Sequence, residues 1–247
     1  MQKYKLTIEY NGAAYSGWQV QLNSYVTIQG KLEEAARKIF KQDIKLLGSG
    51  RTDAGVHAAG QIAHCRIDTP YSNDKIKNAF NGNLPDDIVV LKVEKVKDSF
   101  HAQYSAKGKT YRYQIINRAD RPALLRNFCL HYPYKLNMPL MRKEAKVLVG
   151  RHDFKSFACV DSSDKDKDTV RTIKRLVIRK SGELITIEIE ANGFLYKMVR
   201  NIVSTLLKVG SGKLEKGSVK RILAQKSRLG AVEPVQPYGL TLLKVRY

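Results

Sequence analysis

The sequence predicts an α+β protein of two domains, each with a mainly antiparallel sheet covered by helices, and a basic cleft between them. In several short segments apolar residues recur at every second position, which is the period of a half-buried strand. Between these segments apolar residues recur at steps of three and four, as on a helix packed against a sheet. This succession returns after about residue 105, so we expect domains over residues 1–105 and 106–247 of the 247-residue chain.

The first domain opens with an expected strand over residues 4–10, in which alternate side chains are apolar. Thr27 has the side-chain oxygen of a helix cap, and the apolar stripe of the helix behind it runs from Ile28 to Phe40. Ser72 is a similar cap for a second helix. Further strands are expected over residues 61–67 and 88–96.

The second domain repeats the alternation of strands and helices. In chain order we expect a strand over residues 109–116, a helix over 138–149, strands over 172–180 and 184–190, helices over 194–209 and 215–224, and a strand over 238–245. Two such halves would leave a cleft to which both contribute side chains.

The chain carries a large excess of positive charge. Lys and Arg number 44 and Asp and Glu 23, which gives a formal net charge of +21. Solubility requires a much smaller net charge than this, so the excess favours a polyanionic partner. A merely basic soluble protein is an alternative. The sequence has no apolar run of about 18 residues and no basic amphipathic helix with a bulky apolar face, so nucleic acid is favoured over a membrane.

Cysteine and histidine positions argue against disulfides and metals. Cys65, Cys129 and Cys159 are odd in number and lack CxxC spacing. They suit a reduced cytoplasm, and the alternating N-terminal residues contain no signal-peptide core, so we expect a cytoplasmic protein. His57 and His64 have no cysteine or carboxylate at ligand spacing, and no metal site is expected.

An acidic cluster at residues 161–168 resembles a calcium loop at first sight. The glycine of such a loop is missing, and Arg175 stands where its final glutamate would be. A solvated loop is therefore expected, although its charge within so basic a chain would also suit a role in shaping RNA entry.

A glycine-rich segment, residues 48–55, lies between strand-like segments and should be a loop at a sheet end, where ligands often bind. It is not a phosphate-binding loop, because no Gly-Lys-Ser/Thr follows, and not a dinucleotide fingerprint, because Asp53 replaces a needed glycine. The glycines favour a tight backbone that presents the Asp53 carboxylate and the Arg51 guanidinium together. A turn in which Asp53 bonds its own backbone is the alternative.

Four segments, in order, resemble motifs of the tRNA pseudouridine synthase A family. Residues 51–58 read Arg-Thr-Asp-Ala-Gly-Val-His-Ala, like the active-site motif of that family. Residues 109–113 resemble its Lys-x-Tyr-x-Tyr strand, residues 150–157 its Gly-x-His-Asp-Phe-x-x-Phe segment, and residues 198–201 its Met-Val-Arg-Asn helix. The likeness covers nearly the whole chain. It departs at residues 233–240, where Glu-Pro-Val-Gln-Pro-Tyr-Gly-Leu replaces the usual Ala-Pro-Ala-x-Gly-Leu.

The resemblance implies a homodimer that isomerises uridines in the anticodon arm of tRNA without a cofactor or metal. Asp53 is the implied catalytic carboxylate, acting on C1′, on C6 or on the C2′ proton, and Arg200 is its implied cationic partner. Arg51 and Thr52 are implied substrate-binding residues, with Arg51 entering the RNA where the nucleotide is extruded. Tyr111 is implied to stack on the extruded uracil or to guide a proton.

Other roles stay open at this point. Arg200 would serve equally as a phosphate contact on a helix surface, and Tyr111 as an ordinary core tyrosine. The charge also suits a non-catalytic RNA-binding protein. A further alternative is another RNA-directed enzyme, either a nuclease or a synthase paralogue acting elsewhere in RNA, although metal-binding carboxylates for a nuclease are not evident.

Overall fold

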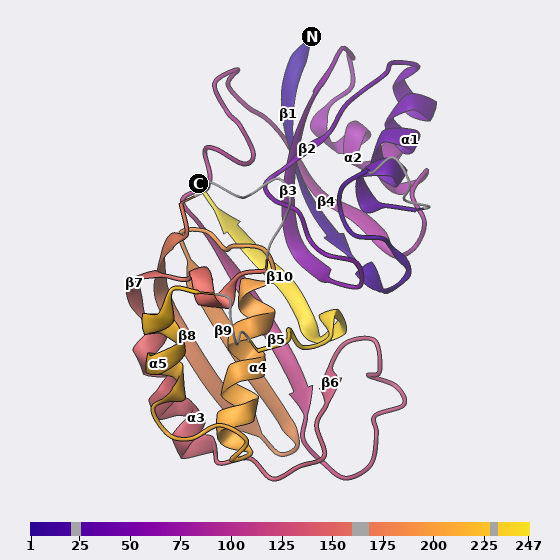
Figure 1. Cartoon of the computed structure of the whole chain (residues 1–247). Helices are drawn as coiled ribbons and strands as arrows, with labels where there is room; N and C mark the ends of the chain where they lie inside the picture. The colour runs from indigo at the N-terminus through magenta and orange to yellow at the C-terminus, as the bar shows by residue number, and fades with distance from the viewer. Residues whose placement is uncertain (21–25, 160–167, 228–231) are drawn as a thin grey trace. The chain divides into compact units, whose positions relative to one another are not determined.

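The structure is a computed structural model, and it describes residues 1–20, 26–159, 168–227 and 232–247. Two compact units are present: Met1–Lys107 with Thr241–Tyr247, and Gly108–Leu240 (Figure 1). Sheets and helices occur in both, which confirms the α+β class. Of the expected acidic loop, only Asp168 is among the described residues.

The units differ from the expected domains at the end of the chain. The expected break after residue 105 lies close to the unit boundary at Lys107. Residues Thr241–Tyr247, expected in the second domain, instead belong to the first unit, where strand β10 (Leu240–Arg246) pairs in parallel with β3 (His57–Ile67). Periodicity reports local structure only, so it carries no signal for a pairing between segments so far apart.

The sheet of the first unit is antiparallel except where β10 joins β3. Alternate side chains of β1 are buried, and those from Tyr4 to Tyr10 are at most 3% exposed, as the pattern predicts. The short strand β2 was not expected, because two residues are too few to show a period. In spatial order the strands are β4 (Ile88–Lys95), β1 (Gln2–Tyr10), β3 and β10, with β2 (Leu47–Gly48) paired to β3.

Helices α1 (Ile28–Phe40) and α2 (Asn73–Asn81) belong to the first unit, and both begin at the expected caps. The Thr27 hydroxyl oxygen accepts from the Gly30 N–H at 3.1 Å, and that of Ser72 accepts from the Lys75 N–H at 3.3 Å. These bonds satisfy amide groups that have no partner inside the helix, which is why such residues favour helix starts.

The second unit has a sheet that is antiparallel apart from one short edge pairing. Helices α3 (Met138–Ala145), α4 (Met198–Gly210) and α5 (Ser218–Gln225) pack against one another, and α3 also contacts the sheet at the strand Val170–Ser181 (Figure 1). The strand order is β5 (Gly108–Ile116), β9 (Leu184–Ala191), β8 (Val170–Ser181) and β7 (Gly150–Asp153), with β6 (Leu130–His131) parallel to β5.

Helix α4 begins at Met198, four residues later than the sequence indicates. The expected start at Phe194 is wrong because Lys197 adopts the left-handed conformation, with φ of 57°, which a helix does not continue through. The apolar residues just before Lys197 have the spacing of a helix's apolar face, but they are not part of the helix. Every residue of α4 except Lys208 is buried, so this helix forms the centre of the second unit.

Short 3-10 helices connect these elements at η1 (Gly12–Ala14), η2 (Lys146–Leu148), η3 (Lys155–Phe157) and η4 (Pro237–Gly239). Across the ranges that the structure describes, no helix has both the length and the apolar character needed to cross a bilayer.

Candidate active site

The loop between β2 and β3, residues 49–56, carries Asp53 and is called the Asp53 loop below. Its first residues are tied to β3 by Gln61, whose side chain is fully buried. The Gln61 Oε1 accepts from the Ser49 hydroxyl at 2.7 Å, and its Nε2 donates to the Gly50 carbonyl at 2.9 Å. The Ser49 N–H also donates to the Ile62 carbonyl at 2.7 Å. The loop therefore leaves the sheet in a fixed direction.

Thr52 holds the middle of the loop. Its side chain is 6% exposed and shares a 2.7 Å hydrogen bond with the Tyr10 hydroxyl, while its carbonyl accepts from the Trp18 N–H at 3.1 Å. Burial raises the pKa of Tyr10, so the hydroxyl keeps its proton. These contacts give Thr52 a structural role in the loop, and its contact with substrate stays a prediction.

Two glycines from the segment after β1 let the backbone pack closely against the loop. A Cβ on Gly12 would lie 2.0 Å from the Val56 carbonyl oxygen, and one on Gly17 would lie 2.6 Å from the Thr52 carbonyl oxygen. Gly17 also has φ of 96°, a conformation that other residues rarely adopt. Any side chain at either position would displace the loop.

The end of the loop is a main-chain turn. The Val56 N–H donates to the Asp53 carbonyl at 3.1 Å, and the next-to-last residue, Gly55, has φ of 77°. The Asp53 side chain is half-buried, whereas that of Arg51 is exposed. His57 is buried and accepts from the Gly12 N–H at Nδ1. This turn is the tight backbone that the glycines favour, and the joint presentation of the carboxylate and the guanidinium stays a prediction.

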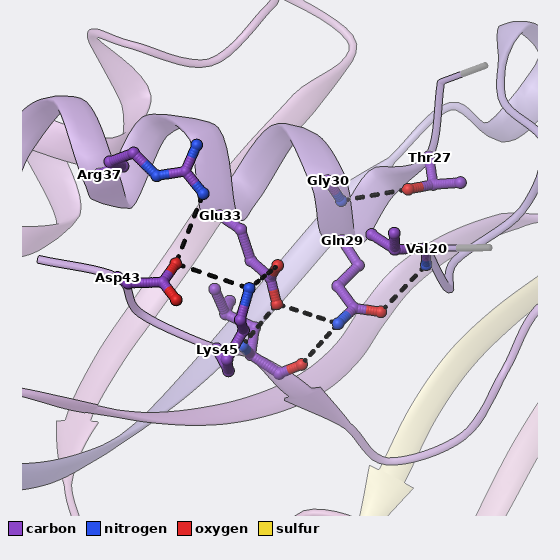
Figure 2. A network of polar contacts seen from close by, with 9 residues as sticks. Val20, Thr27, Gln29, Gly30, Glu33, Arg37, Asp43 and Lys45 are labelled. Carbon is purple, nitrogen blue, oxygen red and sulfur yellow. Dashed lines mark hydrogen bonds and ion pairs between the residues drawn. The ribbon is translucent and has the colours of Figure 1, made fainter. Parts of the chain in front are cut away.

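A second layer of polar contacts from α1 supports the segments that flank the loop (Figure 2). The Glu33 Oε1 accepts from the Leu46 N–H and from Gln29 Nε2, each at 3.0 Å. Gln29 in turn donates to the Leu46 carbonyl at 3.1 Å and accepts from the Val20 N–H at 3.2 Å. The Lys45 ammonium lies 3.8 Å from Glu33 Oε2. Sequence analysis missed Glu33, although an acid inside the apolar stripe of a helix is a signal that could have revealed it.

In the second unit, Tyr111 and Tyr113 lie on one face of β5. Tyr111 is 9% exposed and packs edge-on against Phe194, with ring centroids 5.1 Å apart. Tyr113 is fully buried, and its hydroxyl donates to the Gln236 carbonyl at 2.6 Å. The burial of Tyr111 is compatible with the core role that was left open, and the Phe194 contact fixes the orientation of its ring.

Arg200 lies in the first turn of α4 and is 9% exposed. Its Nε donates to the Val235 carbonyl at 2.7 Å, so Arg200 and Tyr113 together hold the segment that precedes β10. Burial raises the pKa of Tyr113, and the positive charge of Arg200 opposes this rise. This burial disfavours a role for Arg200 as an ordinary phosphate contact on a helix surface.

Two further residues of the family-like segments gain a physical role from the structure. The Asn201 side chain, next to Arg200, donates to the Phe157 carbonyl at 2.7 Å and so joins α4 to the segment of residues 150–157. Lys109 lies two residues before Tyr111 on β5, and burial lowers the pKa of its amine to about 8. Its ammonium is therefore unusually acidic for a lysine.

Arg51, Thr52 and Asp53 thus lie in one loop of the first unit, whereas Tyr111 lies on β5 and Arg200 on α4 of the second. The family model described as tRNA pseudouridine synthase matches residues 6–105 and 145–247, which include all five residues except Tyr111. The chain belongs to the tRNA pseudouridine synthase family.

Individual relatives agree with this assignment to the tRNA pseudouridine synthase family. tRNA pseudouridine synthase A of Thermoanaerobacter sp. is 45% identical over 247 residues, and the protein of that name from Caldicellulosiruptor bescii is 43% identical over 247 residues. tRNA pseudouridine synthase A 2 of Clostridium perfringens is 44% identical over 247 residues. Each alignment covers 100% of both chains, so the resemblance stated from the motifs is confirmed.

Proposed function

We propose that this tRNA pseudouridine synthase converts uridine to pseudouridine in the anticodon arm of tRNA, with the Asp53 carboxylate as its catalytic group and without a cofactor. Family membership makes the protein an isomerase that acts on tRNA. The observation that carries the finer proposal is the position of Asp53 in a motif-bearing loop that buried side chains hold before Asp53 and a main-chain turn closes after it, with the Asp53 side chain only half-buried.

The reaction breaks the bond between N1 and C1′, turns the uracil and joins C5 to C1′. The C5 proton leaves and N1 gains a proton, so nothing is oxidised, reduced or hydrolysed. Asp53 could attack C1′, add to C6 or remove the C2′ proton, and each route requires its ionised form. A nearby guanidinium would stabilise that anion, which is the role proposed for Arg200.

A uridine in a helical stem must leave the stack before its glycosidic bond can be reached, at a cost of a few kcal/mol. We assign Arg51, an exposed cation in the Asp53 loop, to the space that the nucleotide leaves. Tyr111 is assigned to the extruded uracil, where its ring would stack or guide a proton. The net charge of +21 would offset part of the extrusion cost through phosphate contacts. A basic cleft, a homodimer and a cytoplasmic location remain predictions.

The test replaces Asp53 by Asn, which keeps the shape of the side chain and removes its charge. Isomerisation, measured as tritium released from tRNA labelled at C5 of uridine, should fall to background because no route remains. The affinity for tRNA should change by no more than about twofold, since phosphate contacts elsewhere supply most of it.

Asp43→Asn is the matched control, because Asp43 is an exposed acid of the same unit, and this variant should keep full turnover. Retained turnover in Asp53→Asn would contradict the assignment. Tritium release by neither the variant nor the unaltered protein would favour a non-catalytic RNA-binding protein. Loss of pseudouridine from the anticodon arm in cells without the gene would separate this proposal from a paralogue acting elsewhere.

A further inference from the structure

The turn between β4 and β5, residues 101–105, is anchored through Ala102. This residue is fully buried; its N–H donates to His64 Nδ1 at 3.2 Å and its carbonyl accepts from the Tyr247 hydroxyl at 2.7 Å. Burial lowers the pKa of His64 to about 4, so its ring is neutral near pH 7 and Nδ1 can accept. The Ala102 N–H is therefore held by a buried side chain and its carbonyl by a partly buried one.

His101 fixes the rest of the turn. Its Nδ1 accepts from the Gln103 N–H at 3.2 Å and from the Tyr104 N–H at 3.3 Å. Its own N–H donates to the Ser105 hydroxyl oxygen at 3.0 Å, and its carbonyl accepts from the Ser105 N–H at 2.9 Å. A short exposed segment with this many internal hydrogen bonds has little conformational entropy left to lose on binding.

The turn presents one aromatic ring to solvent. Tyr104 is 81% exposed, more than any other aromatic side chain in the part of the chain that the structure describes. His101 stacks against it, with centroids 4.3 Å apart and planes 28° apart. One face of the tyrosine ring is thus covered by His101, and so high an exposure leaves the opposite face open to a ligand.

Lysines lie on both sides of this turn in the sequence. Lys107, which is exposed, follows the turn, and its N–H donates to the Arg246 carbonyl at 2.7 Å, so β10 brings a second cation to the same strand end. Lys97 precedes the turn and is also exposed. The nearest acid in the sequence, Asp98, is already paired with Arg66 at 2.9 Å. The surroundings favour a ligand that carries phosphate.

We propose that Tyr104 is a stacking site for an unpaired base of the RNA substrate, outside the Asp53 loop. RNA loops offer unstacked bases with flat faces, and an aromatic ring fixed in advance binds them without sequence preference. His101 backs the ring, so that the base would complete a three-layer stack. The inference requires an RNA substrate, but it does not depend on the role of Asp53.

The test compares Tyr104→Ala, Tyr104→Phe and Tyr71→Ala, the last removing another exposed tyrosine of the same unit. Affinity for a tRNA transcript, measured by filter binding at fixed salt, should fall about tenfold in Tyr104→Ala. It should stay within about twofold in the other two variants. The slope of log K against log salt should not change, since stacking releases no counterions. In turnover, KM should rise while kcat stays the same.

A second measurement does not depend on any loss of binding. Tyr104→Trp places an exposed indole in a protein whose own Trp18 is 2% exposed, and its fluorescence should be quenched when tRNA is added. The proposal is overturned if Tyr104→Ala binds tRNA like the unaltered protein, if Tyr71→Ala loses as much affinity, or if the indole fluorescence is unchanged at saturating tRNA. Asp53→Asn should bind tRNA normally, and the double variant Asp53→Asn/Tyr104→Trp should be quenched as Tyr104→Trp is, which separates this proposal from the catalytic assignment.

Discussion

Buried polar side chains hold the loop and the residues before it on the N-terminal side of Asp53. Gln61 holds the start of the loop, Tyr10 holds Thr52, and Glu33 holds Leu46 ahead of the loop. Leaving one such buried group unpaired costs about 1–3 kcal/mol, so each contact strongly favours a single loop conformation. When a carboxylate is already held in position before the substrate binds, the free-energy cost of ordering it in the transition state is smaller.

His64 predicts how stability depends on pH. The pKa of His64 is 6.5 in an unfolded chain. In the folded protein burial lowers it to about 4, and the charges of His101 and Lys3 add to this lowering. Between these values the unfolded chain binds a proton that the folded chain does not, so folding is disfavoured as pH falls. This group should cost up to about 3 kcal/mol of stability between pH 6.5 and pH 4.

Urea unfolding of the unaltered protein and of His64→Gln, at pH 7 and at pH 5, measures this effect. The glutamine does not titrate and retains an acceptor for the Ala102 N–H, so the variant should lose less stability on acidification. Equal losses in both proteins would show that His64 does not titrate as inferred.

At the scale of elements, α5 begins without a cap of its own. Its N-cap residue, Gly217, has no side chain, and the first turn holds no acid. Glu144 of α3 takes over this function: its carboxylate accepts from the Gly217 N–H at 2.8 Å and from the Val219 N–H at 3.3 Å, and the residue is 4% exposed. A negative charge at this helix end also interacts favourably with the helix dipole.

Glu144→Ala should lower the free energy of unfolding by about 1–3 kcal/mol, because two amides at the start of α5, one buried and one partly buried, lose their acceptor. Glu144→Gln should lose less, since an amide oxygen still accepts. Glu215→Ala, which removes an exposed acid near the same helix, is the control and should change stability by at most about 0.5 kcal/mol. Urea unfolding checks all three, and equal effects of Glu144→Ala and Glu215→Ala would refute the capping role.

These elements also show what the sequence can and cannot predict. Thr27 and Ser72 were predicted as caps because each bonds an amide three residues ahead, within the reach of a local pattern. An acid inside the apolar stripe of α1 is a local signal that Glu33 is buried, but the contacts of Glu33 and Glu144 join separate elements, so no local pattern predicts their partners. Asp53 and Arg200 were predicted as site residues from the family resemblance of their motifs. Tyr104 could be inferred as a binding residue only from the exposure of its ring in the structure.

For the whole molecule, the charge of +21 determines how tRNA binding responds to salt. Each phosphate neutralised by Lys or Arg releases counterions, so log K should fall linearly with log salt. We expect a loss of about 10³-fold or more between about 50 mM and 200 mM salt, with the same slope in Asp53→Asn. Filter binding over that range provides the measurement, and an affinity that hardly changes with salt would show that phosphate contacts contribute little.

The pairing of β10 with β3 has a consequence for how the protein is made. Thr241 lies opposite His57 and Leu242 opposite Ala58, immediately after the Asp53 loop. A ribosome must synthesise all of Gly108–Leu240 before it can supply this strand to the first unit. Until then the β3 edge that follows the Asp53 loop has no β10 to pair with, so the first unit of a nascent chain is completed only after the second unit has been synthesised.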